Sequence, residues 1–456
     1  MMDTAIAARA VGGSVIGASV PFLRVTTDTR GLNRGDLFVA LKGERYDGHD
    51  FVPHALENGA AAALVDRRHA AAGSGNLIAV DDPLQALAKL ARFWRNRFDI
   101  PLAVVTGSNG KTTTKEMIAA IFRAAAGDVA VAATPGNFNN AIGLPLALLA
   151  LRSTHELAVF EIGMNHRGET RELGAIAEPT IAVITNAQRE HQEFMRSVDE
   201  VAAEHADAIH ALRPQGVAIV NADDARAGVW RDAAAAHAAD VLTFGLDETA
   251  DITARYATHP DGCALELRTP SGSGHAVLHA PGKHMARNAL AAAAAACAAR
   301  LPIEAIVRGL ERFRPVGGRL AITTTAAGVH VIDDSYNANP DSVRAAIDVL
   351  AARPRPRWLV LGDMGEVGDD GPAFHAEIGA YARESGIERM LAAGPLSRDT
   401  ARAFGADGVH FDSVEALADR VARDAGSGVT VLVKGSRFMR MERVVAALTG
   451  STKGGH

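Results

Sequence analysis

The stretch Thr106-Gly-Ser-Asn-Gly-Lys-Thr-Thr113 decides the fold of the chain around it. It follows an apolar run at residues 101–106 that predicts a buried strand, and it leads into a helical pattern that begins at Lys111. In such a strand–loop–helix unit, the backbone N–H groups of the loop and of the helix N-terminus can hold phosphates. The predicted nucleotide-binding residues of the loop are Gly107, Ser108, Asn109, Gly110, Lys111, Thr112 and Thr113.

Two side chains of this loop have the chemistry of an ATP–magnesium site. Lys111 can reach the outer phosphates, and the hydroxyl of Thr112 is placed to bind Mg²⁺. The full Walker pattern has a glycine where this chain has Val105, so we interpret the loop as a shortened variant. The structural alternative is a strand, a turn and a helix that carry Gly-Lys-Thr by chance.

Two further predicted strands lead to candidate metal ligands. Glu161 ends the predicted strand 157–161, and His191 follows the predicted strand 180–186. In a parallel sheet both would lie beyond the carboxyl edge, close to Lys111. Carboxylate and hydroxyl oxygens are ligands that Mg²⁺ uses together with phosphate oxygens. Taken alone, either residue is equally compatible with a solvated surface position.

The chain as a whole predicts an α/β protein of three domains. Its 456 residues correspond to about three domains of roughly 150 residues each. We expect a mixed α/β domain at 1–98, a central parallel sheet with the phosphate loop at 99–316, and a doubly wound, Rossmann-like sheet without a GxGxxG fingerprint at 317–456. Predicted elements outside the centre are a strand at 36–41, a helix at 83–98, and strands at 329–333, 357–362, 390–394, 409–411 and 430–434.

Composition excludes several classes of protein. The net charge is −6 and the pI is near 6.3, which disfavours a non-specific nucleic-acid binder. Two cysteines exclude a disulfide framework and a four-cysteine zinc site. The chain shows no secretory signal and no apolar stretch that could span a bilayer, so we expect a cytoplasmic protein without membrane insertion.

Polar side chains also cluster at predicted strand ends in the third domain. The segment 333–340 (Asp-Asp-Ser-Tyr-Asn-Ala-Asn-Pro) ends one strand, and the segments 361–366 and 433–437 end two more. Such a density of short polar groups is useful at a ligand edge, although a structural turn would also explain the first segment. Lys434 is one of only seven lysines, and it could bind a carboxylate or a transferring phosphoryl group.

Together these motifs resemble those of the Mur ligase family, ATP-dependent amide-forming enzymes of peptidoglycan assembly. The resemblance covers nearly the whole chain. It is carried by TDTR (27–30), ALKGERYDGHDF (40–51), TGSNGKTTTKE (106–116), TPGNFNNAIGLP (134–145), FEIGMNHRGE (160–169), GKHMARNALAAA (282–293), DDSYNANPDS (333–342), LGDMGEVG (361–368) and VKGSRFMRME (433–442). The third-domain motifs are most similar to those of the member that adds D-alanyl-D-alanine, and the DNPR motif of the diaminopimelate-adding member is absent from the sequence.

The resemblance implies a reaction, its cofactors and its partners. ATP would phosphorylate the terminal carboxylate of UDP-MurNAc-tripeptide, and the amine of D-Ala-D-Ala would attack the acyl phosphate to give the pentapeptide precursor. ATP and Mg²⁺ are the implied cofactors, both substrates are small molecules, and the protein is expected to be a monomer. The implied catalytic residues are Lys111, Glu161, His191 and Lys434, and the implied metal ligands are Thr112, Glu161 and His191.

The resemblance also implies binding residues in each domain. Those expected to contact the base, ribose or phosphates of ATP are Asn288, Asn337, Arg319 and Asp334. Those expected near the tripeptide and the transferring phosphate are Thr134, Asn139 and Asn140, and those expected to meet the acceptor dipeptide or phosphate are Lys434 and Ser436. Those expected to hold the UDP-sugar are Thr27, Asp28, Arg30 and Lys42; from the residues alone, these N-terminal loops are as compatible with a structural role.

The sequence departs from the family pattern at two positions. Many members carry a carbamoylated lysine about fourteen residues after the metal-binding histidine; here that position is His205, and no lysine occurs between Lys115 and Lys283. We therefore expect a carbamate-independent enzyme in which Glu204, His205 or water takes this role. Met285 replaces a common asparagine, but Asn288 remains.

Other functions stay open at this point. Another Mur ligase or a folylpolyglutamate synthetase would share the loop but should lack the third-domain motifs. A phosphate-loop kinase, or a binding module gated by a nucleotide, would explain Lys111 and Glu161 but would leave Lys434 and Asp334 without a role. An inactive paralogue is disfavoured because Lys111, Glu161 and His191 are all present.

Overall fold

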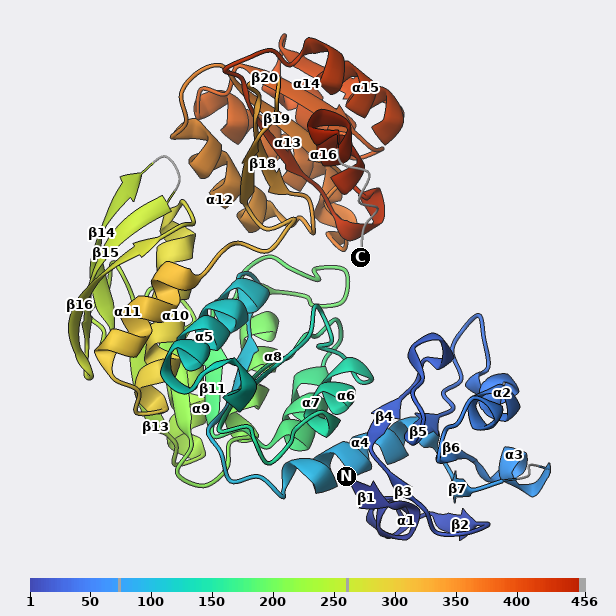
Figure 1. The fold of residues 1–456 in the computed structure, drawn as a ribbon. Helices are drawn as coiled ribbons and strands as arrows, with labels where there is room; N and C mark the ends of the chain where they lie inside the picture. The colour runs from blue at the N-terminus through green and yellow to red at the C-terminus, as the bar shows by residue number, and fades with distance from the viewer. Residues whose placement is uncertain (73–74, 260–261, 451–456) are drawn as a thin grey trace.

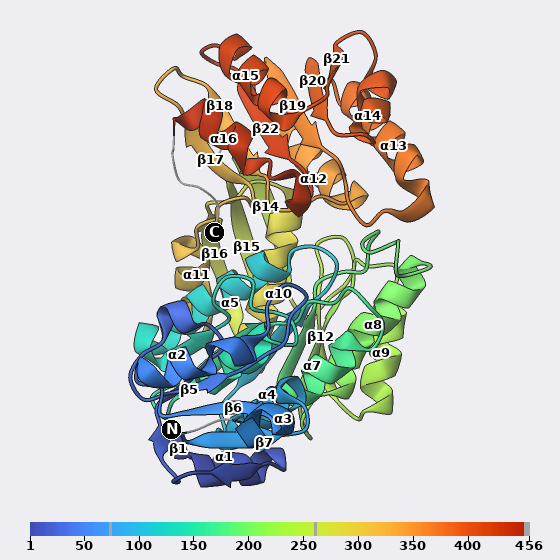
Figure 2. The same cartoon turned by 90° about the vertical axis from the view of Figure 1, so that its right-hand side faces the viewer.

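Three sheet-centred units follow one another along the chain (Figure 1). The computed structural model describes residues 1–72, 75–259 and 262–450. In both views the third unit lies over one end of the central unit and the first unit lies at the opposite end (Figures 1 and 2). The three-domain α/β architecture is therefore confirmed. The boundaries after residues 98 and 316 stay a prediction.

The first unit is a mixed α/β layer, as predicted. Its five-stranded sheet has the order β2 (Ser14–Ile16), β7 (Leu77–Val80), β6 (Ala62–Asp66), β5 (Asp36–Val39) and β4 (Arg24–Thr26), of which only β2 runs antiparallel to its neighbour. The remaining elements are β1 (Met2–Asp3) and β3 (Pro21–Phe22), the short turns η1 (Thr29–Gly31) and η2 (Gly48–Phe51), and the helices α1 (Thr4–Val11), α2 (Val52–Glu57), α3 (Arg67–Ala72) and α4 (Pro83–Arg95).

The central unit is a parallel sheet covered on both faces. Its strands, in spatial order, are β13 (Asp240–Phe244), β12 (Val217–Asn221), β11 (Ile181–Ile184), β8 (Leu102–Thr106), β10 (Leu157–Glu161) and β9 (Val131–Ala133). Alternate residues of β8 enter different cores: Ala103 and Val105 pack with α5 (Lys111–Ala126), whereas Leu102 and Val104 pack on the opposite side. The other elements of this unit are η3 (Asp128–Ala130), α6 (Gly143–Leu149), α7 (Glu169–Ala177), α8 (Val198–His210), α9 (Ala227–Ala236), α10 (Lys283–Ala298) and α11 (Ile303–Arg312).

The third unit is a doubly wound sheet with one antiparallel edge strand. Its order is β17 (Ala321–Thr324), β18 (His330–Asp334), β22 (Thr430–Lys434), β19 (Arg357–Gly362), β20 (Arg389–Ala393) and β21 (Gly408–Phe411), and only β17 is antiparallel. The other elements are α12 (Pro340–Ala351), η4 (Gly368–Asp370), α13 (Gly371–Glu384), α14 (Ser397–Phe404), α15 (Val414–Asp424), η5 (Arg437–Met439) and α16 (Glu442–Thr449).

Several sequence predictions need correction. The helix predicted at 83–98 ends at Arg95, because Asn96 closes its last turn with hydrogen bonds to two preceding carbonyls. The strands predicted at 36–41 and 180–186 end at Val39 and Ile184, because polar loops follow. Strands β14 (Thr253–His259), β15 (Gly262–Thr269) and β16 (Gly272–Leu278) form an antiparallel sheet that was not predicted, and neither was β17. Their faces are half exposed and rich in Gly, Ser and Thr, which weakens the apolar pattern.

Within the described residues, no helix combines the length and the apolar character that crossing a bilayer requires.

Gly309 lets α11 approach α5 closely, which gives a test of this packing. A Cβ at Gly309 would lie 2.3 Å from the backbone Cα of Ile121. We expect Gly309→Ala to lower the free energy of unfolding by about 1–3 kcal/mol, measured by denaturant unfolding. The matched control is Gly228→Ala in α9, where the added Cβ meets no atom within 4 Å. The control should stay within about 0.5 kcal/mol of the parent protein or exceed it, and equal stability of both variants would contradict this packing.

Candidate active site

Two glycines shape the loop between β8 and α5. Gly107 has φ +130° and Gly110 has φ +83°, both in the left-handed region that favours glycine. A Cβ at Gly110 would lie 2.4 Å from Oδ1 of Asn288, so this side chain of α10 rests directly on the loop. Helix α5 begins at Lys111 without a side-chain cap. Its first backbone N–H groups are therefore available to an anion.

Lys111 lies folded over this loop. Its Nζ donates to the carbonyls of Gly107 at 2.5 Å and Ser108 at 3.2 Å. The same Nζ lies 3.4 Å from Oε2 of Glu190. The ammonium group therefore has a carboxylate and two carbonyls as partners, and Lys111 lines a cavity together with the rest of the loop.

The carboxylate of Glu161 joins three segments that are distant in sequence. Its Oε2 accepts a 2.7 Å hydrogen bond from the hydroxyl of Thr112, and its Oε1 accepts one of 2.7 Å from Nδ2 of Asn139. The backbone N–H of Glu161 donates to Oγ1 of Thr134 at 2.8 Å. Only 2 % of Glu161 is exposed. A hydroxyl and a buried carboxylate thus meet at one point, which is the oxygen-rich surrounding that Mg²⁺ requires.

His191 lies at the same edge, at a junction between two domains. It has φ +50°, and its Nδ1 is 2.6 Å from Oε2 of Glu366 in the third unit. Its Nε2 is 3.7 Å from Oε2 of Glu190. Although burial opposes ionisation of Glu190, the neighbouring Lys111, His205 and His191 lower its pKa to about 2.

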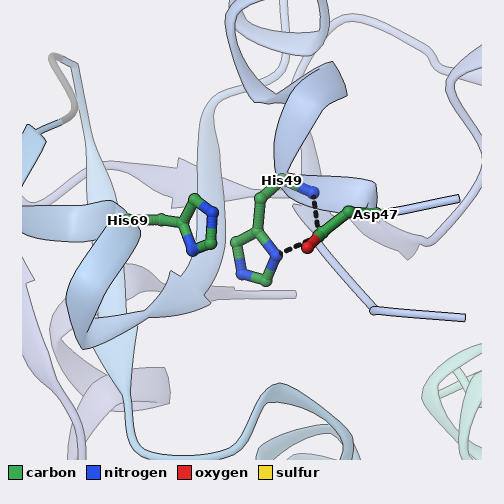
Figure 3. Close-up of side chains that lie close together, drawn as sticks. All are labelled: Asp47, His49 and His69. Atoms are coloured by element: carbon green, nitrogen blue, oxygen red, sulfur yellow. Dashed lines mark hydrogen bonds and ion pairs between the residues drawn. The ribbon is translucent and has the colours of Figure 1, made fainter.

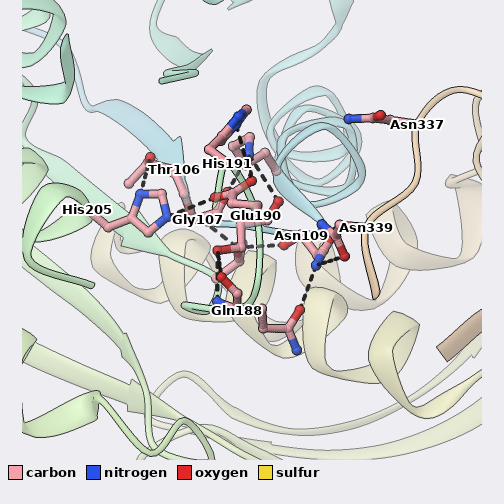
Figure 4. A network of polar contacts seen from close by, with 12 residues as sticks. Thr106, Gly107, Asn109, Gln188, Glu190, His191, His205, Asn337 and Asn339 are labelled. Atoms are coloured by element: carbon pink, nitrogen blue, oxygen red, sulfur yellow. Dashed lines mark hydrogen bonds and ion pairs between the residues drawn. The ribbon is translucent and has the colours of Figure 1, made fainter. Parts of the chain in front are cut away.

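His205 stands behind Glu190 in a buried network (Figure 4). Its Nδ1 is 3.1 Å from Oγ1 of Thr106, and its Nε2 is 3.3 Å from Oε1 of Glu190. Burial lowers the pKa of the His205 imidazole. Glu204 faces elsewhere, because its two oxygens accept hydrogen bonds of 2.8 Å from the backbone N–H groups of Gly168 and Thr170 at the start of α7. Glu204 and His205 were the two side chains expected to take the role of the carbamoylated lysine. Of these, only His205 lies at the site.

The third unit covers the loop through paired polar contacts. Asn109 and Asn339 exchange two side-chain hydrogen bonds, of 3.2 and 3.0 Å. Arg189 donates from Nη2 to Asp341 at 2.6 Å and from Nη1 to Glu377 at 2.7 Å. These contacts hold α12 and α13 against the central unit. They enclose a cavity of about 1000 Å³ between the two units.

The polar strand ends of the third unit form the opposite wall of this cavity. Nζ of Lys434 is 2.6 Å from Oδ2 of Asp334 and donates to the carbonyl of Asn337 at 2.9 Å. The guanidinium of Arg319 stacks over the ring of Tyr336 at 4.2 Å. Predicted residues that line the cavity are Ser108, Asn109, Gly110, Lys111, Thr112, Thr113, Asn139, Asn140, Glu161, His191, Asn288, Arg319, Asp334, Asn337, Lys434 and Ser436.

The predicted UDP-sugar residues lie apart from this cavity. Among the described residues that line it, none of Thr27, Asp28, Arg30 and Lys42 occurs. Asp28 and Arg30 instead form an exposed ion pair of 2.8 Å. Their role in holding the UDP-sugar stays a prediction.

A compact histidine cluster in the first unit is satisfied internally (Figure 3). Nδ1 of His49 is 2.6 Å from Oδ1 of Asp47, and Nε2 of His49 accepts a hydrogen bond of 3.1 Å from the backbone N–H of Asp66. His69 stacks on His49 with ring centroids 3.9 Å apart and an interplanar angle of 17°. Near-parallel rings do not aim their nitrogens at one point, so we assign the cluster a structural role.

Sequence reasoning missed several residues that this geometry places at the site. Glu190 and Arg189 lie in a loop without apolar periodicity, so no pattern indicated them. Asn339 was included only as a member of the segment 333–340. Lys115 is fully buried and donates to the carbonyl of Thr134 at 3.0 Å, which holds the loop that carries Asn139. The scarcity of lysine was the one signal that could have singled out Lys115.

Comparison with protein families identifies all three units. The Mur ligase family catalytic domain matches residues 22–95, the Mur ligase middle domain matches residues 105–296, and the Mur ligase glutamate ligase domain matches residues 318–437.

Comparison with individual proteins gives a consistent result. UDP-N-acetylmuramoyl-tripeptide–D-alanyl-D-alanine ligase of Escherichia coli (strain K12) is 38% identical over 450 residues, covering 96% of each chain. The enzyme of the same name from Bacillus subtilis (strain 168) is 36% identical over 94% of this chain and 93% of its own.

Solved structures of two related enzymes have the same fold over nearly the whole chain. A crystal structure of MurF from Acinetobacter baumannii has a TM-score of 0.90 at 33% identity and covers 99% of both chains. MurF ligase from Thermotoga maritima in complex with ADP has a TM-score of 0.81 at 28% identity and covers 94% of this chain and 97% of that one. With its phosphate loop, its three matched domains and these relatives, the chain belongs to the Mur ligase family of ATP-dependent ligases.

Proposed function

We propose that this protein joins D-alanyl-D-alanine to UDP-N-acetylmuramoyl-tripeptide, with ATP converted to ADP and phosphate, to form the UDP-MurNAc-pentapeptide. One observation carries the proposal: the phosphate loop of the central unit and the cationic strand ends of the third unit face each other across one cavity of about 1000 Å³. A reaction that activates one substrate and delivers a second needs two facing walls of this kind. The names of the relatives support the choice of the two substrates.

The central wall has the groups that phosphoryl transfer requires. The N–H groups at the start of α5 and Nζ of Lys111 would hold the phosphates of ATP, because both present positive charge to the cavity. Asn139, held by Glu161, would stand beside the carboxylate of the tripeptide as it becomes the acyl phosphate. Asn288 and Arg319 would contact the nucleoside at opposite sides of the cavity.

The third-unit wall has the groups that the acceptor requires. Lys434 is held by Asp334 and by the carbonyl of Asn337, so its ammonium group is oriented before any substrate arrives. It would bind the carboxylate of the dipeptide or the developing charge on the phosphate, with Ser436 beside it. The dipeptide amine would then attack the acyl carbon, and the tetrahedral intermediate would collapse with loss of phosphate.

A magnesium site fits the residues present. Thr112 and Glu161 supply a hydroxyl and a buried carboxylate at one point, and His191 lies at the same sheet edge. We propose these three residues as the protein ligands. Mg²⁺ held there would neutralise phosphate charge, which is the chemistry this family of reactions needs.

The remaining assignments extend the same proposal. Residues 1–98 would bind the UDP-sugar through Thr27, Asp28, Arg30 and Lys42, residues 99–316 would bind ATP, and residues 317–456 would bring the acceptor. The protein would act as a monomer in the cytoplasm, without nucleic-acid or membrane partners.

The proposal is tested by a coupled assay of ADP release. We expect release that requires both UDP-MurNAc-tripeptide and D-Ala-D-Ala, because the acyl phosphate turns over only when an amine attacks it. Omission of each substrate in turn is the control. ATP turnover that ignores the dipeptide would indicate a kinase or a nucleotide-gated module and would overturn the proposal.

Glu161→Gln tests the proposed metal ligand. The amide keeps the size of the side chain but removes its charge, so we expect kcat to fall by about 10²–10³ with little change in thermal unfolding. Glu172→Gln, on the exposed face of α7, is the matched control and should keep full activity. A Glu161→Gln enzyme that kept most of its activity would exclude Glu161 from the metal site.

Arg189→Ala tests the contact between the central and third units. Loss of the two ion pairs should let the third unit move away, so we expect a larger radius of gyration by small-angle X-ray scattering. KM for ATP should rise about tenfold, which corresponds to about 1.4 kcal/mol. Arg402→Ala, whose side chain is 79 % exposed, is the control. Unchanged scattering and an unchanged KM would show that Arg189 does not hold the units together.

A further inference from the structure

Glu190 is a buried carboxylate at the edge of the cavity. Its side chain is 8 % exposed. Its Oε1 faces Nε2 of His205 at 3.3 Å, whereas its Oε2 faces Lys111 and His191. A buried carboxylate is costly unless it is paired with cationic or donor groups. Oε2 is therefore the oxygen on the side of the phosphate loop and His191.

The surroundings of Glu190 show where that ligand would lie. Nζ of Lys111 is 3.4 Å and Nε2 of His191 is 3.7 Å from its other oxygen, Oε2. Lys111 belongs to the phosphate loop, and His191 is a proposed metal ligand. Glu190 thus lies between Lys111, which would bind the phosphates, and His191, which would bind the cation. No sequence motif included Glu190.

His205 contacts the Glu190 carboxylate on the side of Oε1. Its ring is fully buried on α8, and its Nδ1 is 3.1 Å from the hydroxyl of Thr106 at the end of β8. When Thr106 donates to Nδ1, the proton of the neutral ring resides on Nε2, which faces Glu190. The histidine therefore acts as a rigid support between the sheet and the carboxylate.

We propose that Glu190, held in place by His205, is a permanent anionic group of this site: it orients Lys111 and offers Oε2 to a divalent cation beside His191. The inference rests on the proposed function and deepens it. The side chain at position 205 carries no amine that could take up CO₂, and the carboxylate comes instead from position 190. The enzyme then needs no CO₂ for activity.

The first test uses the unmodified protein. We expect kcat in buffer stripped of CO₂ to equal kcat with added bicarbonate, and we expect no carbamate signal by ¹³C NMR after incubation with ¹³C-bicarbonate. Activity that collapses without CO₂ and returns with bicarbonate would overturn the proposal. This result would leave the proposed reaction intact, because the requirement for D-Ala-D-Ala is measured separately.

The second test measures cation binding directly. Binding of Mn²⁺ in the presence of ADP, followed by electron paramagnetic resonance, should weaken about tenfold or more in Glu190→Gln. Its kcat should fall, whereas KM for the UDP-tripeptide should change little. Glu172→Gln serves as the matched control. A Glu190→Gln protein that keeps the Mn²⁺ affinity and kcat of the parent would overturn the proposal.

A double variant keeps the proposal testable if Glu190→Gln folds poorly. In Glu190→Ala with His205→Lys, the new amine can add CO₂ to form a carbamate, with release of one proton. We expect this variant to show a ¹³C carbamate signal and to regain Mn²⁺ binding and activity only with bicarbonate. A folded variant that forms the carbamate and regains neither would overturn the proposed role of the anion.

Discussion

The structure of the site depends on a backbone constraint at the end of β8. Gly107 and Gly110 adopt positive φ angles, and so the chain can leave the sheet, turn sharply and start α5 within a few residues. The uncapped start of α5 and Lys111 therefore stand at the carboxyl edge of the sheet. Because all neighbouring strands of this unit are parallel, Glu161 and the loop that carries His191 come to the same edge.

The second wall of the site comes from the sheet of the third unit. The position of this wall depends on contacts that the phosphate loop makes with the third unit. Asn109 belongs to the phosphate loop and exchanges hydrogen bonds with Asn339, the N-cap of α12. Arg189 lies next to Glu190 in sequence and carries the ion pairs to Asp341 and Glu377. The residues that join the units are thus close neighbours of the residues that we propose to bind ATP.

Burying several charged groups in one place is costly unless they are paired in good geometry. Here Lys111, Glu190, His191 and His205 form a connected set, and Asp334 with Lys434 forms another. Lys111, Glu190 and His191 of the first set and both residues of the second line the same cavity. A ligand that brings phosphate and a cation would complete the first set, which is consistent with the catalytic role that we propose for this cavity.

The sequence by itself determined the α/β class, the phosphate loop with Lys111, and the strand-end residues Glu161 and Lys434, because strand–loop–helix units and polar strand ends are local patterns. It did not reveal Glu190, Arg189 or Lys115, since their partners lie far away along the chain. The antiparallel sheet β14–β16 was not predicted, because the polar residues of its exposed face interrupt the apolar pattern. Only the tertiary structure decided that His205 supports a carboxylate while Glu204 caps α7, because neighbouring residues on a helix point in different directions and packing alone selects their partners.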